Sequence, residues 1–146
     1  MRPLTRLRAL SVVALLVAAA ACNNGSSSPT APDQSSVAYS QTDLTVGTGT
    51  EATIGTTATV QYGQWLYSDT AADHKGAQIG ASTFSFVVGG GTIIKGFDTG
   101  VTGMLVGGVR RLIVPPSLAF GATGDSTGTV PPNAALVFDV LLTGVQ

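Results

Sequence analysis

The chain has 146 residues, of which 44% are hydrophobic and 10% charged, with 19 glycines and a formal net charge of −1. This length suits one folded domain, since domains commonly span roughly 100–200 residues. The charge argues against nucleic acid as a partner, because phosphate binding requires clustered Lys and Arg. One cysteine and one histidine exclude an intramolecular disulfide and a multi-histidine metal site, so we expect neither a metal nor a cofactor.

The first 21 residues have the pattern of an export signal. Three arginines within residues 1–8 precede an uncharged apolar run over residues 9–21. A basic region followed by such a run is typical of a secretory signal peptide. The run is too short for a transmembrane helix, which needs about 20 apolar residues. The sequence therefore predicts a signal peptide over residues 1–21.

The only cysteine, Cys22, directly follows the alanines that close the apolar run. This arrangement resembles a bacterial lipobox, which implies that Cys22 is lipidated and anchors the mature chain to a membrane through acyl chains. We expect the protein in the bacterial cell envelope, on the periplasmic or surface side. The alternative is ordinary cleavage after the alanines, which would leave a secreted soluble protein. Without residues 1–21 the chain has four basic and eight acidic residues, which further disfavours nucleic acid.

Residues 23–36 read NNGSSSPTAPDQSS and contain no aromatic or large aliphatic residue. Chains rich in Ser and Gly stay flexible, and this one cannot bury enough apolar surface to order itself. We therefore predict a lipidated cysteine and flexible tether over residues 22–36, followed by the folded domain over residues 37–146.

Several segments of that domain alternate between apolar and polar residues, with the β-branched and aromatic residues that indicate half-buried strands. In the clearest one, Val60 and Tyr62 share a face with Gln64, and Trp65 and Tyr67 share the other. The strands expected on this basis cover residues 44–46, 57–67, 82–88, 109–114 and 135–142.

One helix is expected, because Phe97, Val101, Met104 and Leu105 have the spacing of a single helical face. Two glycines within it each cost about 1 kcal/mol relative to alanine, so tertiary packing must hold this helix. The predicted fold is α+β, an antiparallel sheet wrapped around one short helix. A small β-sandwich or barrel is the alternative if there is no helix.

The sequence shows no sign of a nucleophilic triad, which would need a histidine. His74, the only histidine, lies in a polar segment and is interpreted as a solvated loop residue. The aspartates are scattered without the spacing of a calcium loop, and no P-loop motif is present. An enzyme of this sequence would work without metal, cofactor or covalent intermediate.

Several motifs in the second half of the chain, in order and at matching spacing, resemble the core of FKBP-type peptidyl-prolyl isomerases. They are FSFVVG at 84–89, TIIKGFDTGV at 92–101, RRLIVPP at 110–116, AFG at 119–121 and VPPNAALVFDV at 130–140. The resemblance covers about residues 44–142 and implies a curved antiparallel sheet of about five strands around a short helix. It also implies peptidyl-prolyl cis-trans isomerase activity on proline-containing polypeptides, such as secreted or envelope proteins.

The same resemblance implies an apolar pocket between sheet and helix. The positions that it assigns to catalysis are Tyr62, Ile94 (through its backbone N–H), Phe97 and Phe120. The positions that it assigns to substrate binding are Phe84, Ile93, Val130, Phe138 and Ile79. A twisted prolyl amide is less dipolar than a planar one, so such a pocket would favour it without any proton transfer.

Three positions depart from the family pattern. Phe97 stands at the pocket floor where the family usually has a tryptophan, although active members also carry phenylalanine there. The other two departures remove polar contacts, since Gly80 stands where the family commonly has an aspartate and Phe120 where it usually has a tyrosine. The resemblance therefore implies reduced affinity for macrolide ligands. The same two departures also keep an alternative function open, a non-catalytic, chaperone-like module that binds proline-containing segments.

Overall fold

The computed structural model describes residues 32–146. The predicted signal peptide, Cys22 and most of the predicted tether lie outside the described residues. The elements are β1 Ser40–Thr45, β2 Thr57–Tyr67, β3 Lys75–Val87, α1 Lys95–Val101, β4 Val109–Val114, a 3₁₀-helix at Pro116–Leu118 and β5 Leu136–Val145. No helix in this part of the chain is long and apolar enough to cross a membrane.

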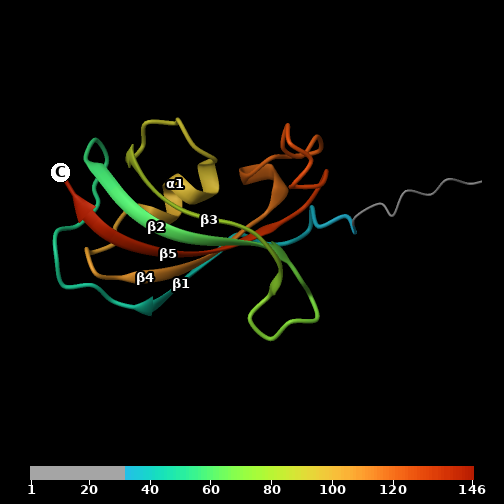
Figure 1. The fold of residues 1–146 in the computed structure, drawn as a ribbon, viewed down its shortest axis with the longest axis horizontal. Coiled ribbons are helices and arrows are strands. Elements are labelled where there is room, and N and C mark those ends of the chain that lie inside the picture. The colour runs from blue at the N-terminus through green and yellow to red at the C-terminus, as the bar shows by residue number, and fades with distance from the viewer. Residues whose placement is uncertain (1–31) are drawn as a thin grey trace, which may run out of the picture.

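The five strands form one sheet in the order β1-β4-β5-β2-β3, and every neighbouring pair is antiparallel. The sheet curves, and α1 packs against its concave side (Figure 1). This confirms the predicted α+β fold, with a five-stranded antiparallel sheet around one short helix. The β-sandwich alternative is wrong.

Four elements have bounds that differ from the predicted ones. β1 spans Ser40–Thr45 rather than residues 44–46, and β5 spans Leu136–Val145 rather than residues 135–142. β3 begins at Lys75 rather than Ser82, because its glycine-rich first half is held by pairing with β2 and not by an apolar pattern of its own. The helix ends at Val101 rather than Leu105. Gly103 has a φ of 81°, which leaves the helix, and its N–H donates to the carbonyl of Ala52 at 2.8 Å. The predicted face is still buried at Phe97, Val101 and Met104.

The core lies between α1 and the concave face of the sheet. Alternate residues of the two central strands point into it, among them Val60 of β2 and Leu136, Val140 and Leu142 of β5, all fully buried. Period-two alternation therefore gives one face of each strand to the core, as the sequence predicts.

The last residues of the predicted tether pack onto the domain. Gln34 is 9% exposed, and its side chain donates to the carbonyl of Tyr67 at 3.1 Å and accepts from the N–H of Ala135 at 2.8 Å. Its own N–H donates to the carbonyl of Asn133 at 3.1 Å. The ordered domain thus begins before Val37, because one glutamine supplies hydrogen bonds that the segment's composition does not reveal.

Candidate functional site

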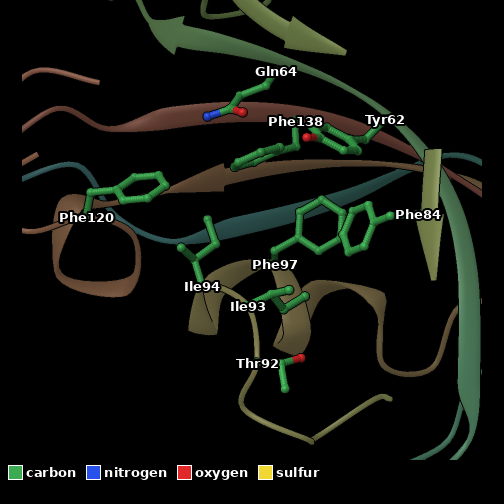
Figure 2. Close-up of a pocket in the computed structure, with 9 residues that line it drawn as sticks. All are labelled: Tyr62, Gln64, Phe84, Thr92, Ile93, Ile94, Phe97, Phe120 and Phe138. Carbon is green, nitrogen blue, oxygen red and sulfur yellow. The ribbon is translucent and has the colours of Figure 1, made fainter. Parts of the chain in front are cut away.

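A cavity of about 490 Å³ lies between the concave face of the sheet and the N-terminal end of α1. Its lining comes from β2, β3, β5, α1 and the segment before it, and the loop after the 3₁₀-helix (Figure 2). The lining residues are Tyr62, Gln64, Phe84, Thr92, Ile93, Ile94, Phe97, Phe120 and Phe138.

Aromatic rings form the deep wall of this cavity. Phe97 of α1 contacts Phe138 and Tyr62 edge-on, with ring centroids 5.2 and 5.6 Å apart. It also contacts Phe84 at 5.8 Å, and Phe84 meets Tyr62 edge-on at 5.6 Å. Such pairs contribute about 0.5–1.5 kcal/mol each beyond the burial of their area. The wall is therefore fixed in shape before any ligand arrives.

The segment that enters α1 brings Ile93 and Ile94 to the cavity. Ile94 is the residue before the helix, with φ −58° and ψ 137°, and its carbonyl accepts from the N–H groups of Phe97 and Asp98 at 3.1 and 3.2 Å. Within residues 32–146, no group accepts a hydrogen bond from the N–H of Ile94. That donor is available to a ligand in the cavity.

Three side chains supply the other polar groups of the lining: the Tyr62 hydroxyl, the Gln64 amide and the Thr92 hydroxyl. None of the nine lining side chains is a carboxylate, imidazole, amine or thiol. The cavity therefore offers apolar contact and neutral hydrogen bonds, and it suits an uncharged, partly apolar ligand such as a peptide segment.

Seven of the nine site residues predicted in the folded domain lie together around the cavity, and two do not. Val130 is 3% exposed and packs in the core, because its N–H and carbonyl are held by Asp125 and direct its side chain inward. Ile79 packs against the core and is the extra residue of a bulge in β3, because Gln64 pairs with Gly80 and Trp65 with Gln78. Neither of these two residues is among those that line the cavity.

Two lining residues, Gln64 and Thr92, are absent from the predicted set. The alternation that gave Tyr62 to one face of β2 also gave Gln64 to it, so the strand pattern contained this signal. Thr92 lies in the glycine-rich loop before α1, where no periodicity identifies which side chain turns inward.

The convex face of the sheet carries a cluster of charged side chains. Arg111 donates to both carboxylate oxygens of Asp139 at 2.7 and 2.9 Å, and Lys75 pairs with the same carboxylate. Burial raises the pKa of Asp139, but the hydrogen bonds from Arg111 and Lys75 outweigh it and leave the pKa below its ordinary value. This cluster ties β5 to its neighbour β4 and, across β2, to β3, and it does not line the cavity.

Residues 48–143 match the model of the FKBP-type peptidyl-prolyl cis-trans isomerase family. The chain is 50% identical over 70 residues to peptidyl-prolyl cis-trans isomerase FKBP53 of Arabidopsis thaliana, covering 48% of this chain and 14% of that protein. It is 38% identical over 104 residues to FK506-binding protein 1B of Neurospora crassa, covering 68% of this chain and 91% of that protein. The crystal structure of AtFKBP13 superimposes with a TM-score of 0.62 and 29% identity, covering 78% of this chain and 98% of that one.

Several of the curated relatives are longer proteins. The chain spans 14% of the first of them and 46% of two others from Arabidopsis thaliana. The similarity therefore concerns one domain that recurs in proteins of different lengths.

Proposed function

Because the chain belongs to the FKBP-type peptidyl-prolyl cis-trans isomerase family, we propose that it accelerates cis-trans rotation about X-Pro bonds in polypeptides that enter the aromatic cavity. The observation that carries this proposal is the lining itself. A preformed apolar wall around Phe97 meets one free backbone donor, the N–H of Ile94. The substrates that we propose for the protein are proline-containing segments of secreted or envelope proteins.

The proposed mechanism uses the electronic structure of the amide. Rotation meets a barrier of about 18–20 kcal/mol because it breaks amide resonance, and prolyl bonds isomerise unaided in tens to hundreds of seconds. The twisted amide is less dipolar than the planar one. Moving from water into a cavity walled by Phe97, Phe138 and Tyr62 is therefore more favourable for the twisted amide than for the planar one. The cavity binds the twisted amide more tightly, and that difference in binding lowers the barrier.

The N–H of Ile94 fixes the position of the substrate. It donates to a carbonyl of the bound segment and holds the proline ring against Phe97, so that rotation occurs inside the cavity. Phe120 lines the end of the cavity opposite Phe84 (Figure 2). No proton moves in this mechanism, which agrees with a lining that has no carboxylate or imidazole.

The proposed location is the cell envelope, with Cys22 lipidated and the domain held on the exported side of a membrane. Support for it comes from the sequence alone, because the leader and Cys22 fall outside the described residues. The order of the segments is consistent with it. The chain joins the domain at Gln34, after a polar stretch that can separate the domain from a lipid surface.

A second candidate function is binding without turnover, in which the cavity retains proline-containing segments as a chaperone would. It is favoured by Gly80 and Phe120, which provide no polar side-chain group at positions where the family commonly has an aspartate and a tyrosine. For the same reason, we expect macrolide ligands to bind this cavity more weakly than they bind family members that carry the aspartate and the tyrosine.

A protease-free isomerisation assay on the purified protein tests the proposal. The substrates are tetrapeptides that vary the residue before proline, and the informative variants are Ile94→Pro and Ile94→Val. Proline fits the φ of −58° at this position and removes only the N–H and part of the side chain. Valine keeps the N–H and serves as the matched control.

We expect the wild type and Ile94→Val to accelerate isomerisation, and Ile94→Pro to lose roughly 2- to 13-fold in kcat/KM, the value of one neutral hydrogen bond. No acceleration by folded wild-type protein would overturn the isomerase proposal. Equal rates for Ile94→Pro and Ile94→Val would overturn the role of the backbone donor.

A further inference from the structure

We propose that the side-chain amide of Gln64 is a second polar anchor for the substrate and binds a backbone peptide group of the segment that enters the cavity. The inference rests on the proposed function, because it assigns a binding role within the same cavity. Three observations support it: the position of Gln64 in the cavity, the lack of a hydrogen-bond partner for its amide within the described residues, and the glycine that pairs with it on β3.

Gln64 lies on the cavity side of β2, two residues after Tyr62, and lines the cavity. Figure 2 shows its amide over Phe138, on the side of the cavity away from Ile94. A substrate lying between β2 and the entry to α1 would therefore meet the Ile94 N–H on one side and the Gln64 amide on the other.

The amide of Gln64 makes no hydrogen bond to another group within residues 32–146, and its polar atoms are not sealed from solvent. Water can satisfy this amide in the free protein, and a ligand can take the place of that water. A glutamine amide carries two donor hydrogens and an acceptor oxygen. It can thus pair with either side of a peptide group.

The residue across the sheet leaves this amide accessible. Gly80 of β3 pairs with Gln64, and a Cβ at Gly80 would lie 3.5 Å from the Gln64 side-chain oxygen. A larger side chain at position 80 would occupy the space around the amide or pair with it. Because Gly80 has no side chain, the Gln64 amide stays accessible to a ligand. Gln64 thus supplies the polar contact that position 80 does not.

Binding through the backbone predicts a specific kinetic effect. The contact forms equally in the planar and twisted states, since it is made to a peptide group beside the rotating bond. Its loss should raise KM and leave kcat unchanged. The effect should also be similar for all residues before proline, because no substrate side chain takes part.

The test compares the full protein with Gln64→Leu and Gln61→Leu. Leucine has nearly the size of glutamine and lacks the amide. Gln61 is exposed on the opposite face of the same strand, so its variant is the matched control for strand propensity and surface change. Peptide dissociation constants are measured by NMR titration, and kcat and KM by the isomerisation assay, on one panel of proline tetrapeptides. Thermal unfolding verifies that all three proteins are folded.

We expect Gln64→Leu to weaken binding roughly 2- to 13-fold for every peptide, with KM raised by the same factor and kcat retained, and Gln61→Leu to match the wild type. Equal affinities for Gln64→Leu and wild type would overturn the inference and leave the isomerase proposal intact. Weakening confined to peptides with a polar residue before proline would also overturn it, because it would place the contact on a side chain. Binding without isomerisation, still weakened by Gln64→Leu, would overturn the isomerase proposal and support Gln64. No peptide binding to the wild type would overturn both.

Discussion

The carboxylate of Asp98, in the first turn of α1, accepts a hydrogen bond from the backbone N–H of Gly89 at 2.7 Å. Asp98 is only 8% exposed, so this bond ties the helix to the start of the loop that carries Thr92, Ile93 and Ile94. Two sides of the cavity, the helix with Phe97 and the loop before it, are thereby held in one arrangement.

Replacing Asp98 with alanine should lower the free energy of unfolding by about 1.5–3 kcal/mol, the value of a hydrogen bond to a charged group. It should also lower kcat/KM, because the Ile94 donor loses its fixed position. Urea unfolding and the isomerisation assay measure the two effects. Thr99→Ala, an exposed neighbour on the same helix, should change stability by less than about 0.5 kcal/mol. Wild-type kinetics in Asp98→Ala would contradict the positioning role.

Gly100 should tolerate no side chain, although alanine is the better helix former. A Cβ at Gly100 would overlap the fully buried side chain of Leu112 on β4. Overpacking of this kind costs about 1–3 kcal/mol and exceeds the gain of about 1 kcal/mol in helix propensity. Gly100→Ala should therefore unfold at lower denaturant concentration than the wild type.

A double-mutant cycle isolates that contact. Leu112→Val makes room next to position 100, so the double variant should lose less stability than the two single variants predict together. Strictly additive losses would show that overlap with Leu112 does not cause the destabilisation of Gly100→Ala.

The fold could be predicted from the sequence wherever one face of an element is apolar. The alternation around Val60 and Tyr62 gave β2, and the spacing of Phe97, Val101 and Met104 gave the helix face. The start of β3 and the end of α1 could not be predicted in this way. Pairing with β2 holds the glycine-rich start of β3, and a single backbone conformation at Gly103 ends the helix.

The cavity was predictable for its apolar residues and less so for its polar ones. Aromatic positions such as Phe97 and Phe138 were identified through the resemblance to a family. Val130 and Ile79 lie outside the lining of the cavity, because a residue can align with a pocket position while its side chain turns into the core. Gln64 was passed over because an aligned family pattern says nothing of a polar group that the family does not share.

Acid should destabilise the protein partly through Asp139. The pKa of Asp139 lies below its ordinary value in the folded state. The ionised carboxylate therefore stabilises the fold at pH values above its unfolded pKa of about 3.9, and this stabilisation is lost as the pH falls through the folded pKa. Asp139→Asn should therefore be less stable at neutral pH and lose less stability between about pH 5 and pH 2. Asp69→Asn, an exposed carboxylate without an ion pair in the described part of the chain, is the control. Parallel pH profiles for Asp139→Asn and wild type would contradict the assignment.

Catalysis should be insensitive to pH near neutrality. None of the nine lining residues carries a carboxylate, an imidazole or an amine, so no general acid or base is available in the cavity. We expect kcat/KM to stay constant between about pH 6 and pH 8. A bell-shaped profile in this range would point to an acid or base that the proposed mechanism does not contain.

Lipidation of Cys22 should decide where the protein is found. In a bacterial host, the wild-type chain should fractionate with membranes and incorporate labelled fatty acid, since several acyl chains hold a protein on a bilayer. Cys22→Ser should abolish both while leaving the domain folded. Recovery of unlabelled wild-type protein in the soluble fraction would favour ordinary signal cleavage instead.

The most direct measurement of the central claim is two-dimensional exchange NMR on a proline peptide at equilibrium, with the purified protein present far below the peptide concentration. Unaided exchange takes tens to hundreds of seconds and gives no cross peaks on the timescale of the experiment. The account predicts cis-trans exchange cross peaks with the wild type and weaker ones with Ile94→Pro. Shifts of the protein signals on peptide binding, without exchange cross peaks, would contradict it and identify a binding module.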